Sequence, residues 1–472
     1  MAGGTARVSK RAKAIFVGGT ASHAGKSWMA TAICRHLHNR GLRVAPFKAQ
    51  NMSNNSFPCA HGGEIGRAQV AQAEACGLEP EPDMNPVLLK PTSNMSSQAI
   101  VNGKVWKNLS SADYFGQTAF LRQTAHDAYE RLASRFEYVV IEGAGSIAEL
   151  NLKSRDYVNL SMARAAGAGA LLVSDIDRGG VFASIIGTLG LLDPEERSLV
   201  RAFAVNRFRG DRALFDDGVR ILEEKSDCRS LGVFPMLEGA TLQQEDSVSL
   251  DDAVSDPDSS IAIVRLPRIS NFTDFRLLRA EWVSRPVERD FTWIILPGTK
   301  NTIGDLAWLR QNGLDSWIRQ QHGRGAKVLG VCGGYQMLGR TIEDPGGMES
   351  GSPSAAEGLG LLPVRTVLEA AKVVRTVRAR VGGVEVGGYE IHLGRTEIDA
   401  ALPAFAELPD GRRDGVVNGR VMGTYLHGVF EHEALARLLF GECRESARGC
   451  YDELAAWFER YANLKLFAEL YL

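Results

Sequence analysis

A glycine-rich run near the start of the chain has the residue types and spacing of a phosphate-binding loop. It begins at Gly18 and ends in Gly25-Lys26-Ser27. In such a loop backbone N–H groups enclose a phosphate, a lysine balances its charge and a hydroxyl binds Mg²⁺. Counted from Gly19, the spacing is one residue longer than the common G-x4-G-K-[ST] pattern. A glycine-rich turn with a surface lysine is the alternative. The apolar run before the loop and the helical pattern after it favour ATP binding by Gly25, Lys26 and Ser27.

Polar side chains that directly follow apolar runs are the next candidates. Glu142, Asp175 and Asn206 each stand at the end of a predicted strand. The carboxyl ends of parallel strands share the ligand edge of a sheet, and Mg²⁺ prefers oxygen ligands. We therefore expect Ser27 and Glu142 to bind Mg²⁺, and Asp175 to be either a second metal or substrate contact or a cap. Asn206 has the paired donor and acceptor that can read an adenine edge.

The loop Lys48–Ser56 is dense in amide side chains, which suit recognition of carboxylates or amides. An ordinary polar surface loop is the alternative, and composition does not decide between them. Its candidate substrate contacts are Lys48, Gln50 and Asn51. Three arginines are candidates for binding substrate carboxylates, with surface salt bridges as the alternative. They are Arg155, Arg178 and Arg209.

A cysteine between a predicted strand and a predicted helix is the candidate nucleophile. Cys332 follows the strand-like run Lys327–Val331, and Gly333 after it permits a sharp turn that exposes the thiol. A helix N-terminus lowers a thiol pKa and favours attack on an amide carbonyl. His427, which follows another apolar strand, is the candidate base. We interpret the other cysteines as small buried apolar residues.

The second half also offers donors for an oxyanion. Gly298 and Thr299 end a further predicted strand. Their backbone N–H groups, together with that of Gly333, can form an oxyanion hole, in which one donor contributes about 3 kcal/mol.

Alternating strand-like and helical patterns predict an α/β fold, with a P-loop parallel-sheet domain first. Within it, Ala99–Trp106 contains the Asn-Gly signature of a tight hairpin. An acidic stretch that lacks large apolar clusters predicts a solvated linker. We place an ATP-binding domain at 1–240, the acidic linker at 241–260, a second α/β domain at 261–440 and a helical tail at 441–472, with a β-rich region at about 361–398.

The amino-acid composition limits the kinds of partner and the cellular compartment that we expect for this chain. The chain has 472 residues and a formal net charge of -2, so no basic excess points to nucleic acid. No apolar stretch reaches membrane-spanning length. Seven cysteines without a CxxC pair argue against a disulfide framework or a zinc site and favour the cytoplasm. The oligomeric state stays open, with a homodimer among the options.

Taken together, the motifs resemble the cobyric acid synthase family over nearly the whole chain. The first half is similar to dethiobiotin synthetase and the second half to class I glutamine amidotransferases. The segments that carry the resemblance are Lys48–Ser53, Ile141–Ser146, Asp175–Phe182, Asn206–Gly210, Ser270–Phe275, Leu296–Thr302, Tyr389–His392 and Thr424–Gly428.

This resemblance implies ATP- and glutamine-dependent amidation of the b, d, e and g carboxylates of adenosylcobyrinic acid a,c-diamide in cobalamin biosynthesis. It further implies that Lys26 and Ser27 contact phosphate and Mg²⁺, that Glu142 binds Mg²⁺ and that Asn206 contacts the base. Cys332 would be the nucleophile and His427 its base. Because free ammonia is mostly ammonium at neutral pH, we expect a protected path between the domains.

One position departs from the wider amidotransferase class. Most class I members place a glutamate two residues after the histidine, where this chain has Val429, and Glu431 lies further on. The residue that orients His427 is therefore left open. The related cobyrinic acid a,c-diamide synthase is one rival interpretation. A P-loop ATPase switch with an inactive amidotransferase-like tail is another, against which the presence of both Cys332 and His427 weighs.

Overall fold

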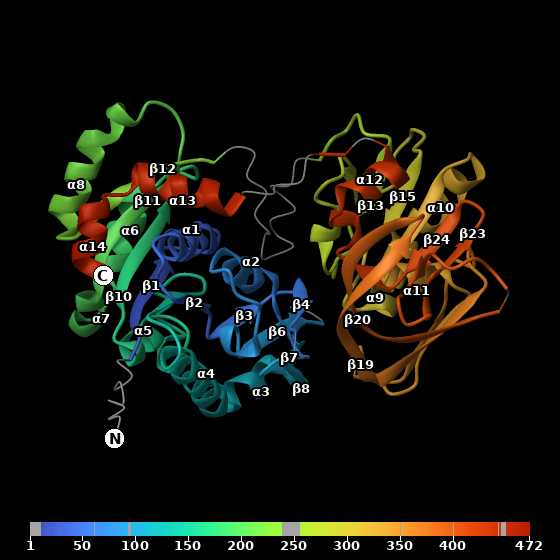
Figure 1. The fold of residues 1–472 in the computed structure, drawn as a ribbon, viewed down its shortest axis with the longest axis horizontal. Coiled ribbons are helices and arrows are strands. Elements are labelled where there is room, and N and C mark those ends of the chain that lie inside the picture. Colours follow the sequence, from blue (N-terminus) through green and yellow to red (C-terminus); the bar gives the residue numbers. More distant parts are fainter. Residues whose placement is uncertain are drawn as a thin grey trace, which may run out of the picture.

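The computed structural model describes residues 11–60, 62–92, 96–237, 255–349, 351–399, 401–441, 443–444 and 450–472. These residues form two α/β lobes, which lie side by side in Figure 1. Most of the predicted acidic linker, 241–254, lies outside the described residues, so its boundaries stay a prediction. The α/β class with parallel sheets is confirmed in both lobes.

The first lobe is built on a six-stranded sheet in the order β12-β11-β10-β1-β9-β2, in which every neighbouring pair is parallel. Its strands are β1 (Lys13–Gly19), β2 (Val44–Phe47), β9 (Tyr138–Glu142), β10 (Gly169–Asp175), β11 (Val200–Phe208) and β12 (Arg229–Pro235). Its helices are α1 (Lys26–Asn39), α4 (Thr118–Ala133), α5 (Leu160–Ala166), α6 (Val181–Gly190), α7 (Pro194–Leu199) and α8 (Asp216–Ser226). Apolar clusters cover both faces of the sheet, as a buried parallel sheet requires.

An excursion between β2 and β9 faces the second lobe (Figure 1). It holds a four-stranded sheet in the order β3-β6-β7-β8, a two-stranded sheet β4-β5 and the buried helix α2. The bounds are β3 (Gln50–Met52), β4 (Ser56–Pro58), β5 (Glu64–Gly66), α2 (Arg67–Ala75), β6 (Val87–Pro91), β7 (Ser96–Val101), β8 (Lys104–Ser110) and α3 (Ser111–Gly116). The predicted Asn-Gly hairpin is confirmed, because Val101 pairs with Lys104 and the φ angles of Asn102 and Gly103 are 48° and 78°.

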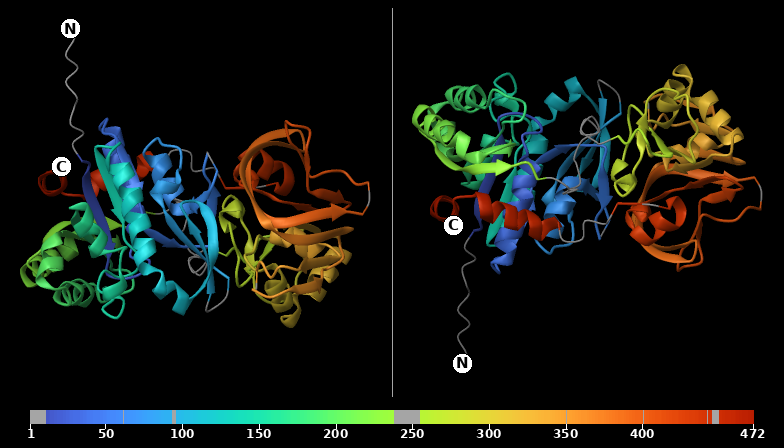
Figure 2. Two further views of the ribbon diagram at one scale, coloured as in Figure 1. Left: turned by 90° about the horizontal axis from the view of Figure 1, so that it is seen from below. Right: turned by 90° about the horizontal axis from the view of Figure 1, so that it is seen from above.

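The last two helices, α13 (Cys450–Tyr461) and α14 (Leu464–Tyr471), return to the first lobe (Figures 1 and 2). Phe458 and Phe467 are fully buried there in the same cluster as α1 and β1. Burial of such a side chain contributes about 1.5–3 kcal/mol. The sequence predicts a helical tail at 441–472 that follows the second domain. In the structure its two helices complete the core of the first.

The second lobe has two sheets. The first runs β14-β13-β15-β16-β24-β23 and is parallel except for the β23-β24 pair. Its strands are β13 (Ile261–Val264), β14 (Glu281–Val283), β15 (Trp293–Leu296), β16 (Lys327–Val331), β23 (Val416–Asn418) and β24 (Val421–Thr424). The helices of the lobe are α9 (Thr302–Gln311), α10 (Leu314–Gly323), α11 (Gly333–Leu338) and α12 (Glu433–Phe440).

The second sheet of this lobe contains the long antiparallel pair β19 (Val364–Val381) and β20 (Val384–Ile398), which confirms the predicted β-rich region. It also includes β17 (Thr341–Asp344), β18 (Ser354–Glu357), β21 (Ala406–Glu407), β22 (Arg413–Asp414) and β25 (Leu426–His427). Because β25 pairs with β20, Tyr389 lies opposite His427.

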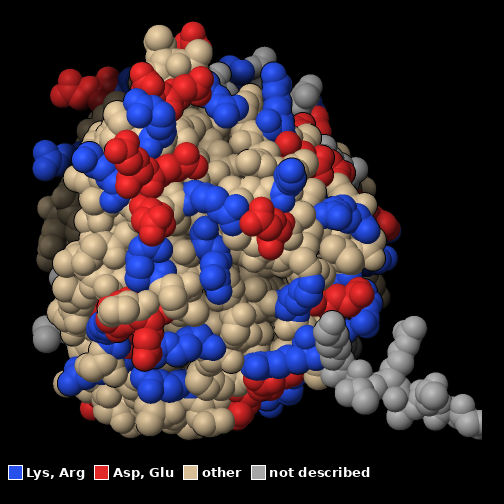
Figure 3. Space-filling model, turned by 90° about the vertical axis from the view of Figure 1, so that its left-hand side faces the viewer, with Lys and Arg blue, Asp and Glu red and all other residues tan. Residues whose placement is uncertain are grey.

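The outer face of the first lobe mixes charges of both signs (Figure 3). Steering of a polyanion needs a field of one sign, which this face does not present. In the part of the chain that the structure describes, no helix has the length and apolar character needed to cross a membrane.

Two candidate active sites

The glycine-rich loop connects β1 to α1 at the carboxyl edge of the first sheet. The Lys26 ammonium folds back over this loop and donates to the carbonyls of Ala21 and Gly145, each at 2.9 Å. The φ of Gly25 is 97°, and a Cβ added there would lie 1.9 Å from Nδ2 of Asn206, so only glycine fits. The loop therefore has the strand–loop–helix context that the sequence predicts for phosphate binding.

Glu142 lies at the end of β9 at the centre of a buried polar cluster. Its carboxylate accepts from Ser27 Oγ at 2.8 Å, Lys48 Nζ at 2.9 Å and Gln72 Nε2 at 2.5 Å. Burial alone would raise the pKa of Glu142, but Lys48 and these hydrogen bonds outweigh burial and lower it. The carboxylate is therefore ionised beside the Ser27 hydroxyl, which is the oxygen pair expected of a Mg²⁺ site.

Asp175 and Asn206 end neighbouring strands but have different surroundings. Asp175 accepts from the Asp177 N–H at 2.8 Å and pairs with Arg207 at 3.3 Å, which matches the capping alternative. Asn206 donates to the Ala24 carbonyl at 3.0 Å and so supports the phosphate-binding loop. Among the described residues no group of three or more His, Cys, Asp or Glu side chains could hold a metal ion. The metal role of Asp175 and the base contact of Asn206 stay predictions.

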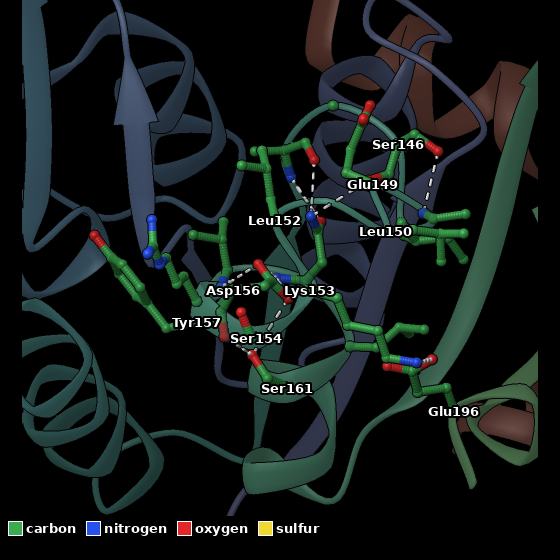
Figure 4. Close-up of a pocket in the computed structure, with 18 of the residues that line it drawn as sticks. Ser146, Glu149, Leu150, Leu152, Lys153, Ser154, Asp156, Tyr157, Ser161 and Glu196 are labelled. Atoms are coloured by element: carbon green, nitrogen blue, oxygen red, sulfur yellow. Dashed lines mark hydrogen bonds and ion pairs between the residues drawn. The ribbon is translucent and has the colours of Figure 1, made fainter. Parts of the chain in front are cut away.

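A cavity of about 620 Å³ opens beside the phosphate-binding loop. Gly145, whose carbonyl accepts from Lys26, lies on its wall, and the segment Ser146–Ser161 surrounds much of it (Figure 4). Within this segment, the guanidinium of Arg155 lies 4.5 Å from the centre of the Phe115 ring on another wall. The cavity therefore adjoins the residue that Lys26 of the glycine-rich loop contacts.

The four predicted substrate residues are divided among different places. Gln50 lines the large cavity and accepts hydrogen bonds from Tyr114 and Tyr157. Lys48 is buried against Glu142, and Asn51 is buried and donates to Gln69 at 2.8 Å. Arg178 is exposed and lies 3.9 Å from Asp175. Only Gln50 of the four borders the cavity.

In the second lobe Cys332 occupies a strained turn between β16 and α11. Its φ is 51° and its ψ is -110°, an unusual conformation for a residue other than glycine. The turn is held by the Cys332 N–H, which donates to the Thr424 carbonyl at 2.8 Å. A Cβ at Gly334 would lie 2.0 Å from the Leu296 carbonyl oxygen, so the turn can form only with glycine there. This geometry is that of a nucleophile elbow.

The predicted oxyanion loop lies against this turn. A Cβ built on Gly333 would be 3.1 Å from the Thr299 backbone nitrogen, and one built on Gly298 would be 3.1 Å from Cε1 of His427. The structure thus brings Gly298, Thr299 and Gly333 together beside Cys332 and His427. Their role as oxyanion donors stays a prediction.

His427 is fully buried and is oriented by a residue that the sequence analysis does not assign. Its Nδ1 lies 2.6 Å from Oδ2 of Asp274, and the other oxygen of Asp274 accepts from the Gly428 N–H at 2.8 Å. Burial disfavours the imidazolium, but Asp274 and Cys332 outweigh it and raise the pKa of His427 to about 10. Nε2 of His427 has no hydrogen-bond partner among the described residues, which leaves it available to a reacting thiol.

Asp274 occupies the place of the expected third member of a Cys-His-acid triad. It comes from the segment Ser270–Phe275, more than 150 residues before His427, so no local spacing could reveal it. Glu431 instead pairs with Arg67 and Arg276 at 2.9 and 2.8 Å. The only signal in the sequence was that Ser270–Phe275 belongs to the segments that carry the family resemblance.

The cavity beside Cys332 is lined by residues of both lobes. Lys90 of the first lobe and Lys300, Glu349 and Lys372 of the second line it. Burial and the nearby ammonium of Lys90 lower the pKa of Lys300 to about 8. Burial raises the pKa of Glu349 to about 7. The docked lobes therefore form one continuous charged cluster over the thiol.

Comparisons with known proteins match both lobes. Residues 15–247 match the CobQ/CobB/MinD/ParA nucleotide binding domain, and residues 260–435 match the CobB/CobQ-like glutamine amidotransferase domain. A cobyric acid synthase from Dehalococcoides mccartyi is 46% identical over 97% of this chain and 96% of its own length. One from Parabacteroides distasonis is 46% identical over 95% of each chain, and one from Novosphingobium aromaticivorans is 45% identical over 96% of each.

Proposed function

The chain belongs to the cobyric acid synthase family, and on this premise we propose which residues hydrolyse glutamine and which activate the carboxylate that is amidated. It is a glutamine-dependent ligase with a nucleotide-binding domain and an amidotransferase domain. The finer proposal is that it uses ATP and Mg²⁺ to amidate the b, d, e and g carboxylates of adenosylcobyrinic acid a,c-diamide. The observation that carries it is the presence, in one chain, of a phosphate-binding loop beside a large cavity and of a buried Cys332–His427–Asp274 arrangement.

The second lobe releases ammonia from glutamine. Asp274 holds Nδ1 of His427 as a donor, so that Nε2 is free to exchange a proton with the Cys332 thiol. The thiolate attacks the glutamine side-chain carbonyl and forms a tetrahedral intermediate, whose oxyanion is stabilised by N–H groups of Gly298, Thr299 and Gly333. His427 then protonates the leaving nitrogen, and water hydrolyses the resulting thioester to glutamate.

The first lobe makes a carboxylate reactive toward that ammonia. A carboxylate does not lose its oxygen to ammonia directly, so it is phosphorylated first, and phosphate then leaves as the amide forms. The Lys26 ammonium, which now donates to the carbonyls of Ala21 and Gly145, would donate to phosphate oxygens of the bound nucleotide instead. Ser27 and Glu142 would hold Mg²⁺, which when bound neutralises charge on the nucleotide. When the metal is absent, the Lys48 ammonium balances the negative charge of the Glu142 carboxylate.

The large cavity is the proposed corrinoid site. Its volume of about 620 Å³ lies within the roughly 300–1,000 Å³ usual for ligand pockets, and Gly145 on its wall accepts from Lys26 of the phosphate-binding loop. Arg155 lies there over the Phe115 ring, and among the described residues it forms no ion pair. It is thus positioned to bind one carboxylate of the substrate while another faces the nucleotide.

Incubation of the purified chain with the diamide, ATP, Mg²⁺ and glutamine tests the function, with products followed by mass spectrometry. Successive replacement of OH by NH₂ gives four stepwise products. Omission of ATP should prevent all of them, and replacement of glutamine by ammonium salt should retain them. If neither nitrogen source gives product, the proposed substrate is wrong.

A further inference from the structure

Helix α2 connects the two sites through side chains that are all buried. Near its C-terminal half, Gln72 donates to Glu142 at 2.5 Å, and one turn earlier Gln69 accepts from Asn51 at 2.8 Å. At its first residue, Arg67 reaches into the second lobe. Arg67 and Gln72 are five residues apart, which is about 7.5 Å along a helix. One short rigid element therefore contacts both the Glu142 cluster and the amidotransferase lobe.

Arg67 makes its contacts close to the catalytic histidine. Its guanidinium pairs with Glu431 at 2.9 Å and lies 5.8 Å from the centre of the Tyr389 ring. The Tyr389 ring in turn stacks on His427, with centroids 5.3 Å apart and planes 22° apart. The same tyrosine pairs with His427 through the backbone of β20 and β25. Arg67, the Tyr389 ring and the His427 imidazole thus form one continuous series of contacts.

Several buried polar atoms along this route have no hydrogen-bond partner among the described residues. They are Nε and Nη1 of Arg67, Nε2 of Gln69, Oε1 of Gln72 and the Tyr389 hydroxyl. A buried polar atom left unpaired costs about 1–3 kcal/mol. An arrangement that served only to hold the lobes together would gain from apolar side chains here. These atoms are therefore donors and acceptors that a small movement of α2 or Tyr389 could pair.

We propose that Arg67, a residue of the ATP lobe, is a positioning residue of the glutaminase. We further propose that α2 couples the occupancy of the nucleotide site to the position of Arg67. Mg²⁺ held by Ser27 Oγ and Oε1 of Glu142 would displace Lys48 from Oε1 and turn the carboxylate, whose other oxygen, Oε2, accepts from Gln72. The resulting adjustment of α2 moves Arg67 against Tyr389 and sets the imidazole for proton transfer. This inference rests on the proposed function, because it needs glutamine hydrolysis at Cys332.

The test compares Arg67→Met with Arg276→Met. Both variants remove one of the two arginines that pair with Glu431, but among the described residues Arg276 forms no hydrogen bond, ion pair or cation–π contact with α2 or Tyr389. Glutamate release is measured with and without ATP and Mg²⁺, together with ammonium-dependent amidation and the thermal unfolding midpoint. Arg67→Lys, which keeps the charge, is the conservative variant.

We expect nucleotide to raise glutaminase kcat in the native chain and in Arg276→Met. In Arg67→Met kcat should fall by about three- to thirty-fold and the response to nucleotide should disappear. Its KM for glutamine and its ammonium-dependent amidation should stay near the native values, and Arg67→Lys should recover part of the response. Equal losses of glutaminase kcat in Arg67→Met and Arg276→Met would show that Arg67 is only an interface contact, and this result would overturn the inference. So would a native glutaminase that ignores nucleotide. A native chain without any glutaminase activity would instead refute the proposed function.

Discussion

Replacement of Asp274 by asparagine is the sharpest test of the glutaminase. The substitution keeps the shape of the side chain but changes what faces Nδ1 of His427. Asp274 is 1% exposed, and both of its oxygens are used, one by His427 at 2.6 Å and one by the Gly428 N–H at 2.8 Å. If the asparagine oxygen keeps the Gly428 bond, its NH₂ group must face Nδ1. Nδ1 then accepts instead of donating, so the neutral imidazole carries its proton on Nε2 and can neither take the proton of the thiol nor form the imidazolium that Asp274 stabilises.

The expected loss follows from that reversed tautomer. Replacing the acid of such a triad by its amide lowers kcat by up to about 10⁴-fold, so we expect glutamine hydrolysis by Asp274→Asn to fall by about 10²- to 10⁴-fold. Ammonium-dependent amidation should be retained, because Glu142 and the phosphate-binding loop lie in the other lobe. The matched control is Asp290→Asn, an exposed carboxylate of the same lobe that pairs with Arg324 at 2.9 Å. Glutamine-dependent turnover of Asp274→Asn within threefold of this control would refute the assigned role.

The same variant has a defined effect on stability. The pKa of His427 is raised from 6.5 to about 10, mainly by Asp274 acting against burial. A raised pKa contributes stability that is fully present below pH 6.5 and is lost as pH rises through 10. Urea unfolding of the native chain and of Asp274→Asn should therefore differ most at pH 6.5 and converge toward pH 10. A difference that is constant with pH would show that Asp274 does not hold the imidazolium.

Three further variants separate the two sites. Lys26→Ala should abolish amidation from either nitrogen source while glutamate release stays measurable. Normal amidation by this variant would show that Lys26 does not bind the nucleotide phosphates. Glu142→Gln keeps the size of the side chain but removes its charge, so a Mg²⁺ titration of ATP use should shift to higher concentration, and an unshifted titration would leave Glu142 a structural residue. Cys332→Ser should lose glutamine-dependent amidation, and ammonium salt at raised pH should restore product. Normal use of glutamine by Cys332→Ser would mean that the nucleophile is misassigned.

Local patterns were sufficient where the chemistry is made by neighbours in the chain. The glycine-rich loop and the Cys332 elbow each need a strand, a turn and a helix in direct succession, and each has that succession in the structure. The β19-β20 pair and the Asn-Gly hairpin are likewise local. Lys48 shows the limit of this approach. Its loop is polar in sequence, but folding buries the lysine against Glu142, which no composition argument could decide.

Long-range packing accounts for what the sequence analysis could not place. Helices α13 and α14 are amphipathic, and nothing in their residues says which lobe their apolar faces cover. Their packing on α1 links the end of the chain to its beginning across the whole second domain. Asp274 could not be found for the same reason, since it meets His427 of β25 only when the segment Ser270–Phe275 packs against that strand.

The charged contact between the lobes explains why both chemistries belong in one chain. Glu64 of the first lobe, beside the cavity of the thiol, accepts hydrogen bonds from Lys90 of its own lobe at 3.0 Å and from Lys372 of the other. Lys300, next to the oxyanion loop, donates to Gln98 of the first lobe at 3.0 Å. Separation of the lobes would leave these buried ammonium and carboxylate groups without their partners, which is far more costly than loss of a surface ion pair. Docking thus places Cys332 at a cavity lined by residues of both lobes, and the protected path for ammonia that the sequence predicts would begin there.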